Sequence, residues 1–374
     1  MALSKEQVLT ALRQVRSPDG TALPDAGVLS DVVVSDGKVF FSLTVDAETV
    51  KTWEPARQAA EAAVRAIPGV QSALVALTAE RTADRGGHSP AAKPAQRAAH
   101  PADKTQPGIP GVDSVIAVAS GKGGVGKSTT AVNLALGLRE LGLKVGILDA
   151  DIYGPSLPKL LAIKEKPQTI GGTRLKPIDR YGLTAMSIGF LIDEETPMIW
   201  RGPMVMSAIT QMLREVEWGK LDVMVVDMPP GTGDAQLTMA QQVPLKGAVI
   251  VSTPQDLALI DARRGVSMFK RVNVPVLGVV ENMSYFLCPS CGTRSDIFGH
   301  GGARHEAERL GVPFLGEVPL HMSIREKSDA GLPVVATEPD GVHARIYRDI
   351  AGKVLAQLRG KAANRVAPKI VIEA

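Results

Sequence analysis

The chain has 374 residues, more than a single hydrophobic core usually supports, so we expect one large domain and a smaller one. Apolar residues make up 45% and charged residues 22%, which is typical of a soluble globular protein, and the net charge of +3 is too small to favour nucleic acid as a main partner. Residues 1–15 lack the apolar core of a signal peptide, and no run approaches the roughly 18 apolar residues of a membrane helix, so we expect a cytoplasmic protein with no membrane partner.

Residues 1–81 predict a small α-β-β-α-β domain. Ser4 and Gln7 form a capping box ahead of an apolar helical face. Two β-branched runs flank the turn at residues 35–38 and indicate a hairpin, and an Ala-rich helix and a third strand follow. The predicted elements after the first helix are strands Val28–Val34 and Val39–Val45, helix Glu54–Ile67 and strand Val70–Leu77.

Residues 82–112 contain too few large apolar side chains to fold, so we expect a flexible linker there. From residue 113 to residue 361, short continuous apolar runs alternate with helical segments, which is typical of a mainly parallel α/β sheet covered on both faces. Residues 362–374 are expected to be a loose tail. The strand candidates are Val115–Ala119, Val145–Leu148, Val223–Val226, Ala248–Val251, Val276–Val280 and Pro313–Glu317.

Residues 121–128, GKGGVGKS, satisfy the phosphate-loop pattern G-x-x-x-x-G-K-S/T between a predicted strand and a predicted helix. Glycines let the backbone wrap closely enough for its N–H groups to point at phosphate oxygens, and the following helix presents its positive end. Lys127 is expected to reach the β- and γ-phosphates of ATP, and Ser128 to offer its hydroxyl to Mg²⁺. The predicted loop contacts to ATP are Gly121, Lys122, Gly123, Gly124, Val125, Gly126, Lys127, Ser128 and Thr129.

The three spaced glycines of this loop also fit the dinucleotide pattern G-x-G-x-x-G. A dinucleotide turn has no use for a lysine and a hydroxyl at Lys127 and Ser128. Asp227 follows the apolar run Val223–Val226, where a magnesium-nucleotide site needs a second carboxylate. The sequence therefore predicts a P-loop NTPase, with Ser128 and Asp227 as the magnesium ligands and Asp227 among the nucleotide contacts.

Lys122, directly after the first glycine, resembles the deviant phosphate loop of the family that contains MinD, ParA and the nitrogenase iron protein. A second loop lysine cannot easily turn onto its own phosphates. In a face-to-face dimer it can reach the neighbour's nucleotide, as an arginine finger does. We therefore expect a homodimeric ATPase in which Lys122 and Lys127 are both catalytic.

Residues 149–156 and 227–234 resemble the two switch regions of that family. The resemblance implies that Asp151 orients the attacking water and is catalytic, and that Gly231 senses the γ-phosphate through its N–H. Asp149 has a second interpretation as a helix cap. Asn282 matches the family position that recognises the base, although an Asn at a strand end also forms turns.

The two cysteines of the chain, Cys288 and Cys291, lie in the sequence CPSCG. This spacing lets two thiolates converge on one metal centre. A 4Fe-4S cluster or a tetrahedral zinc needs four ligands, and two copies of the chain supply four thiolates. On ligand chemistry alone, an iron-sulfur cluster, Zn²⁺ and a redox-active dithiol all remain open.

The motifs SGKGGVGKST, DADIYGPS, DMPPGTGD, ENMSYFLCPSCG and IFGHGG, read in order, resemble the Mrp/ApbC family of iron-sulfur carrier ATPases. The resemblance implies a labile 4Fe-4S cluster that bridges the dimer at Cys288 and Cys291, and partners that are cluster scaffolds and apo iron-sulfur proteins. The leading domain resembles the SufT/PaaD-like iron-sulfur assembly domain. Residues 1–85 contain no cysteine, so a docking role is expected of that domain rather than cluster ligation.

Two other functions compete with cluster carriage. A MinD/ParA-like positioning ATPase would bind membrane or DNA, but no basic amphipathic helix closes the sequence and the net charge is slight. An ATP-driven reductase like the nitrogenase iron protein holds its cluster by two separately placed cysteines, whereas Cys288 and Cys291 are close together. His300 and His305 flank the cysteines, and their simpler interpretation is capping or stacking rather than metal ligation.

Overall fold

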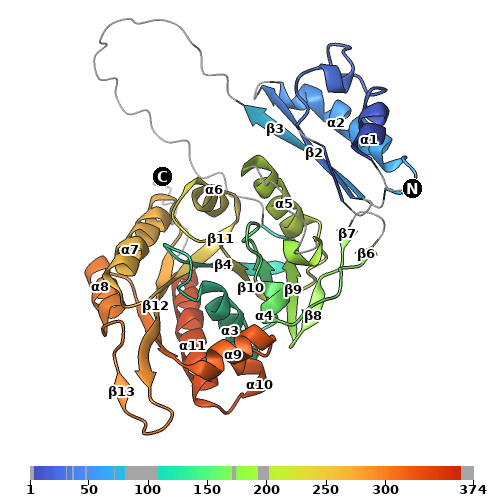
Figure 1. Ribbon diagram of the computed structural model, residues 1–374. Coiled ribbons are helices and arrows are strands. Elements are labelled where there is room, and N and C mark those ends of the chain that lie inside the picture. Colours follow the sequence, from blue (N-terminus) through green and yellow to red (C-terminus); the bar gives the residue numbers. More distant parts are fainter. Residues whose placement is uncertain are drawn as a thin grey trace, which may run out of the picture. The chain divides into compact units, whose positions relative to one another are not determined.

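The computed structural model describes residues 4–30, 32–35, 38–46, 49–70, 72–80, 108–170, 174–192 and 202–363. These residues form two compact units, a smaller one built mainly from the first 80 residues and a larger one built mainly from the residues after 107 (Figure 1). The predicted linker lies outside the described residues up to residue 107, and the predicted tail lies outside them from residue 364 onward. Within the described ranges, no helix is long and apolar enough to cross a membrane.

A three-stranded sheet and two α-helices make up the smaller unit. Its first helix, α1 (Lys5–Leu12), begins at Ser4, whose hydroxyl accepts a hydrogen bond from the Gln7 N–H at 3.3 Å. The Gln7 side chain accepts one from the Ser4 N–H at 3.0 Å, so the predicted capping box is confirmed. The remaining elements are β1 (Val33–Ser35), β2 (Lys38–Asp46), α2 (Val50–Arg65) and β3 (Ser72–Glu80).

The pairing of these strands confirms the predicted hairpin. β1 pairs antiparallel with β2, and β2 pairs parallel with β3 across the α2 crossover. β1 is shorter than the predicted strand Val28–Val34, because residues 28–30 bond β2 only at single positions, such as Thr44 N–H to the Val28 carbonyl at 2.7 Å. The core of the unit includes Phe41 and Leu43, which are fully buried between the sheet and its helices.

Nine of the described strands form one sheet in the larger unit, in the order β13-β12-β11-β4-β10-β5-β9-β8, with β14 also paired to β12. β8 and β13 are antiparallel to their neighbours and the other pairs are parallel, so the predicted mainly parallel α/β sheet is confirmed. The strands are β4 (Val112–Ala119), β5 (Val145–Asp149), β8 (Ile178–Arg180), β9 (Leu183–Ser187), β10 (Leu221–Asp227), β11 (Leu245–Ser252), β12 (Val276–Leu287), β13 (Arg294–Ser295) and β14 (Phe314–Leu320).

The helices of the larger unit lie on both faces of this sheet. The chain moves along the sheet in one direction from β4 through α3 (Lys127–Glu140) to β5, and in the opposite direction from β11 through α7 (Asp256–Arg271) to β12. Right-handed crossovers therefore place α3 and α7 on opposite faces. α11 (Val342–Ala363) packs beside α3 (Figure 1). Because the winding direction reverses near β4, ligands are expected at the carboxyl end of that strand.

The other elements are shorter and connect these layers. β6 (Thr169–Ile170) and β7 (Arg174–Leu175) pair with each other in a separate small sheet. The remaining helices are α4 (Leu157–Leu160), α5 (Gly202–Arg214), α6 (Asp234–Gln242), α8 (Gly302–Leu310), α9 (Met322–Ala330) and α10 (Val334–Thr337).

Strands of the larger unit also differ from the prediction in their bounds, and one of them is new. β4 begins at Val112, inside the range predicted as linker, because Ile109 is buried and the Gly111 carbonyl accepts a hydrogen bond from Leu221 N–H at 2.8 Å. β9 is a buried strand that the prediction lacks. β12 does not end near Val280 but continues to Leu287, since the polar residues at its middle are buried with hydrogen-bond partners.

Candidate nucleotide site and cysteine hairpin

A pocket of about 400 Å³ opens where β4 ends, and the phosphate loop forms one of its walls. The loop contributes Ser120, residues 122–124 and residues 126–129, while Gly121 and Val125 pack behind the lining. The opposite wall comes from the segment after β5, from Pro230 and from α9. The lining residues on this wall before Pro230 are Asp151, Pro155, Ser156, Lys159 and Leu160.

Close packing explains two of the loop glycines. A Cβ placed on Gly121 would lie 2.3 Å from the backbone carbonyl of Asp261 in α7. Gly126 has a φ of +78°, and a Cβ there would lie 2.2 Å from Nδ2 of Asn282. Only glycine satisfies either position, since in the first case the obstacle is backbone and in the second the conformation is left-handed.

Lys127 and Asp227 form a buried ion pair at the base of the pocket. The Lys127 ammonium donates to Asp227 Oδ1 at 2.5 Å and to the Ser128 hydroxyl at 3.1 Å. Asp227 is fully buried and its Oδ2 has no hydrogen-bond partner among the described residues. An unpartnered carboxylate oxygen beside a serine hydroxyl is the hard donor set that Mg²⁺ requires, so these residues fit the predicted ion.

Asp149, at the end of β5, holds the segment that follows it. Its carboxylate accepts hydrogen bonds from the N–H groups of Asp151 at 3.1 Å, Ser156 at 2.8 Å and Leu157 at 3.0 Å, and from the Ser187 hydroxyl at 3.0 Å. The alternative interpretation of Asp149 as a helix cap is therefore confirmed, since Leu157 begins α4. Burial, and then the neighbouring charge of Asp227, raise the pKa of Asp149 to about 7.

Asp151 lies on the pocket wall with 8% of its surface exposed. Burial raises the pKa of its carboxyl, the charge of Lys127 opposes that rise, and the charge of Asp227 adds to it. The structure therefore brings Asp151, Lys127 and Asp227 into one electrostatic group. The role of Asp151 in orienting water stays a prediction.

The second predicted switch region contacts the phosphate loop directly. Gly231 donates its N–H to the carbonyl of Ser120 at 3.0 Å, and the Ser120 hydroxyl donates to the carbonyl of Lys122 at 2.8 Å. Lys122 itself lines the pocket. The N–H that we expect to meet the γ-phosphate is thus bonded to the loop, so it must exchange partners to sense a nucleotide.

Asn282 lies inside β12 rather than at a strand end, and its amide packs against the phosphate loop. Its Nδ2 donates to the Val125 carbonyl at 2.8 Å, and only 7% of the residue is exposed. It is not a turn residue, since β12 continues beyond it. Asn282 does not line the 400 Å³ pocket. Recognition of the base by its amide stays a prediction.

The cysteines occupy the turn of the hairpin between β12 and β13. Phe286 pairs with Ser295 and Leu287 with Arg294, which sets Cys288 directly after the last residue of β12. Cys288 donates its N–H to the Thr293 carbonyl at 3.0 Å and accepts at its own carbonyl from Gly292 at 2.8 Å. These bonds fix the turn that carries both thiols.

The two thiols differ in exposure. Cys291 is exposed, whereas Cys288 is partly buried. The Thr293 hydroxyl, 3.2 Å from the Cys291 sulfur, lowers the pKa of that thiol, helped by the Thr293 backbone N–H and by a hydrogen bond from Cys288. A lowered thiol pKa favours the thiolate, which is the form that ligates metal.

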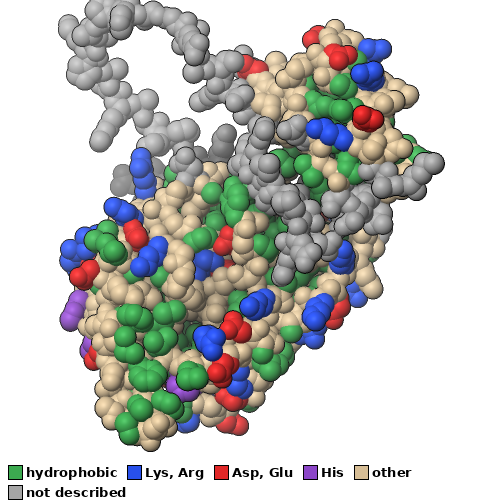
Figure 2. All heavy atoms as spheres, viewed as in Figure 1, with side chains coloured by type: hydrophobic (Ala, Val, Ile, Leu, Met, Phe, Trp, Pro, Cys, Tyr) green, Lys and Arg blue, Asp and Glu red, His purple; other side chains and the backbone are tan. Residues whose placement is uncertain are grey.

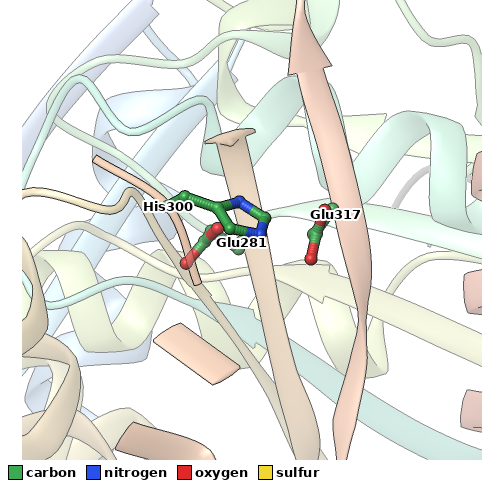
Figure 3. A group of neighbouring side chains, drawn as sticks. All are labelled: Glu281, His300 and Glu317. Carbon is green, nitrogen blue, oxygen red and sulfur yellow. The ribbon is translucent and has the colours of Figure 1, made fainter. Parts of the chain in front are cut away.

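His300 belongs to a polar cluster beside β12, with Glu281 and Glu317 facing it (Figure 3). The ligand atoms of these three residues lie within 4.8 Å of one another. Two arginines already neutralise the cluster: Arg294 Nη2 lies 2.7 Å from His300 Nδ1, and Arg304 donates to Glu317 at 3.1 Å. The cluster therefore links β12, β13 and β14 through arginine contacts, and the structure gives His300 an arginine partner rather than the expected capping or stacking role.

Sequence reasoning missed the residues that complete the far wall of the pocket. Ser328 and Asp329 come from α9, some 200 residues after the phosphate loop, and no motif marks them. Lys159 lies just beyond the first predicted switch region, and its ammonium is 3.8 Å from Asp329. Lys159 follows the predicted switch residue Asp151 closely in the sequence, and this nearness could have indicated that Lys159 lines the pocket.

Comparisons with known proteins agree with this geometry. The family model ParA, described as NUBPL iron-transfer P-loop NTPase, matches residues 111–355, and a model described as iron-sulfur cluster assembly protein matches residues 5–75. The iron-sulfur cluster carrier protein of Synechocystis sp. is 44% identical over 368 residues, which cover 94% of this chain and 98% of that protein. The Escherichia coli protein of the same name is 56% identical over 256 residues, or 68% of this chain and 69% of that one.

A solved structure is also similar. The nucleotide-binding protein of Archaeoglobus fulgidus in complex with ADP has 39% identity and a TM-score of 0.55, and the likeness covers 63% of this chain and 92% of that one. The predicted resemblance to iron-sulfur carrier ATPases, with an assembly domain ahead of the P-loop domain, is confirmed by these matches. The chain belongs to the family of NUBPL iron-transfer P-loop NTPases.

Proposed function

We propose that the protein is an ATP-hydrolysing carrier that holds a 4Fe-4S cluster between two copies of the chain and passes it to apo-proteins. The observation that carries the proposal is the placement of Cys288 directly after β12, the strand whose Asn282 bonds the phosphate loop. One strand thus joins a nucleotide pocket to a pair of thiols. The family matches and the names of the relatives agree with cluster transfer.

The nucleotide half of the proposal assigns roles to four charged residues at the pocket. Lys127 would exchange its partner Asp227 for the phosphates, and Asp227 with Ser128 would hold Mg²⁺, which neutralises phosphate charge when bound. Asp151 would orient the attacking water. Lys122 would reach the nucleotide of the partner copy, so hydrolysis would depend on the dimer.

The cargo half of the proposal depends on ligand number. Each hairpin supplies two thiols, one of them with a lowered pKa, and a 4Fe-4S cluster needs four thiolates. Exposure of Cys291 suits a cluster that is loaded from a scaffold protein and released to an acceptor. The leading domain, matched to the iron-sulfur assembly model, would dock those partners in the cytoplasm.

Anaerobic reconstitution with iron and sulfide tests cargo binding. We expect about four iron atoms per dimer and a broad charge-transfer absorbance in the parent protein, and loss of both in Cys291→Ala. Ser290→Ala, in the same turn, is the matched control and should retain the cluster. Cluster retention in Cys291→Ala, or a parent that stays monomeric with nucleotide and iron, would refute the proposal. Zinc bound in preference to iron would point to a structural site instead.

Hydrolysis is tested separately with the two loop lysines. Lys127→Ala should abolish both nucleotide binding and turnover, whereas Lys122→Ala should retain binding to the monomer and lose turnover. An equal mixture of Lys122→Ala with a hydrolysis-deficient Asp151→Ala chain should regain activity if Lys122 acts across the dimer. Normal turnover by Lys122→Ala alone would contradict catalysis in trans.

A further inference from the structure

The backbone of β12 is irregular between Asn282, which bonds the phosphate loop, and the end of the strand before Cys288. Met283 has a φ of +54°, in the left-handed region that residues with a Cβ rarely adopt. Along β14, Asn282 pairs with Val318 and Phe286 pairs with Leu320, so the stretch of four steps in β12 faces a stretch of two steps in β14. β12 therefore has a bulge at Met283, where it contains more residues than the facing stretch of β14.

Contacts on both sides of Met283 hold the bulge. On one side, Asn282 bonds the Val125 carbonyl of the phosphate loop at 2.8 Å. On the other, the buried Ser284 hydroxyl donates to Glu281 at 2.6 Å, and Glu281 also accepts the Ala303 N–H at 2.6 Å. A strained residue persists only where its surroundings fix it, and one of these fixing contacts is the phosphate loop itself.

The position of the bulge separates the regular ladders of β12. The ladder with β11 reaches Glu281, and the ladder with β13 begins at Phe286. The Met283 side chain also reaches the loop, since its Cε lies 3.9 Å from a Cβ placed on Gly126. A movement of the loop on nucleotide binding would therefore displace Asn282 and Met283 directly. The extra residues of the bulge then allow the backbone at residues 283–285 to rearrange and to move the hairpin that follows.

We propose that Met283 is a positioning residue that couples the two sites: nucleotide binding relaxes the bulge, and β12 then moves Cys288 relative to β13. The inference rests on the proposed function for its biological meaning, because it states how nucleotide would alter the hold on a cluster. The left-handed strain disfavours the bulge. Nucleotide binding that releases the strain is thereby favoured. The coupling is reciprocal, so a change in the hairpin that relaxes the bulge should in turn raise the affinity for nucleotide.

Glycine and alanine at this position isolate the backbone term. Both variants lose the thioether side chain, but only Met283→Ala keeps a Cβ and with it the strain at positive φ. Glycine stabilises the bulge, so a nucleotide that relaxes the bulge should bind the glycine variant more weakly. Asparagine tolerates left-handed geometry better than most other residues with a Cβ, so the nucleotide affinity of Met283→Asn should fall between those of the glycine and alanine variants.

The test uses the full-length protein without cluster, so it does not depend on cargo. Thiol reaction with a chromogenic aromatic disulfide is followed with and without magnesium and a non-hydrolysable ATP analogue, and analogue affinity is measured by calorimetry. In the parent protein, the analogue should change the thiol rate roughly fivefold or more. Met283→Gly should bind the analogue about fivefold to thirtyfold more weakly than Met283→Ala, and its thiol response should need correspondingly more analogue.

Each alternative result overturns the inference. Equal analogue affinity in the glycine and alanine variants would show that strain at Met283 is not released by nucleotide, and tighter binding by glycine would place the bulge in the bound state. A parent whose thiols ignore the analogue would show that the two sites are independent. A coupled parent that takes up no cluster would instead refute only the proposed function, so the two failures are distinguishable.

Discussion

Replacing Asp227 with Asn should change nucleotide affinity in opposite directions with and without magnesium. In the structure, Lys127 donates to Asp227 at 2.5 Å, and both side chains are buried. A nucleotide that arrives without Mg²⁺ must take Lys127 from this partner and place its phosphates beside a carboxylate. Asp227→Asn removes the carboxylate charge and frees the lysine, so binding of ADP in a chelating buffer should tighten.

The size of the effect follows from the bond that is broken. A hydrogen bond between charged groups contributes about 1.5–3 kcal/mol, and each 1.4 kcal/mol corresponds to a factor of ten in affinity. ADP without magnesium should therefore bind about tenfold to a hundredfold more tightly to Asp227→Asn than to the parent. With Mg²⁺ present the variant lacks a proposed ligand of the ion, so its affinity for Mg-ADP should fall below that of the parent.

Calorimetric titration of ADP in chelator and in excess Mg²⁺ gives both affinities. Asp149→Asn is the matched control, since Asp149 is equally buried but holds the segment after β5 by its backbone N–H groups. It should not tighten chelated ADP to the same degree. Weaker binding by Asp227→Asn in both buffers would refute the reasoning, because it would mean that Asp227 does not compete with the phosphates for Lys127. Thermal unfolding of each variant checks that the fold survives.

Three further predictions concern packing, thiol chemistry and pH. Gly121→Ala should lower the free energy of unfolding by about 1–3 kcal/mol, because its Cβ meets the α7 backbone at 2.3 Å, whereas Gly123→Ala, with open space around it, should stay within about 0.5 kcal/mol of the parent in denaturant unfolding. Thr293→Val should slow alkylation of Cys291 at pH 7 but not at pH 10, because the hydroxyl that lowers the thiol pKa is lost; Thr293→Ser, as control, should react like the parent, and equal slowing at both pH values would contradict the explanation. The raised pKa of Asp149, about 7 against an ordinary 3.8, means that between pH 4 and pH 7 the folded protein keeps a proton that the unfolded chain has lost. Its contribution to the free energy of unfolding should therefore fall as pH rises through that window, and Asp149→Asn should flatten the fall; an unchanged pH profile would oppose this assignment.

The phosphate loop and the cysteine pair could be predicted because each is encoded locally. Glycines that allow close approach, the lysine and the hydroxyl all lie within residues 121–128, and their place between a strand and a helix was visible in the apolar pattern. Asp227 was predicted for a related reason, because it directly follows an apolar run that indicates a strand, where a magnesium-nucleotide site needs a carboxylate. Residues 149 and 227 are in fact direct partners in the ladder between β5 and β10.

Features that depend on distant segments could not be predicted in this way. The far wall of the pocket comes from α9, whose Ser328 and Asp329 follow no motif. β9 was missed because Thr184 and Ser187 interrupt its apolar run, although the Ser187 hydroxyl is buried against Asp149 at 3.0 Å. The length of β12 was missed for the same reason, since polar residues within it look like the start of a loop until their tertiary partners are known.

These misses share a physical cause that bears on how the two sites communicate. A polar residue inside a buried strand is stable only when another element satisfies it, and in β12 those elements are the phosphate loop for Asn282 and the amino end of α8 for Glu281. A continuous apolar strand would have joined the sheet equally well but would have had no bond to the nucleotide loop. Asn282, one of the polar residues that obscure β12 in the sequence pattern, is thus also the residue that bonds the strand to the phosphate loop, and the strand ends directly before Cys288. A change in how the loop holds Asn282 would therefore be transmitted along the few residues of β12 that precede the thiols, and variants at Met283 test that transmission.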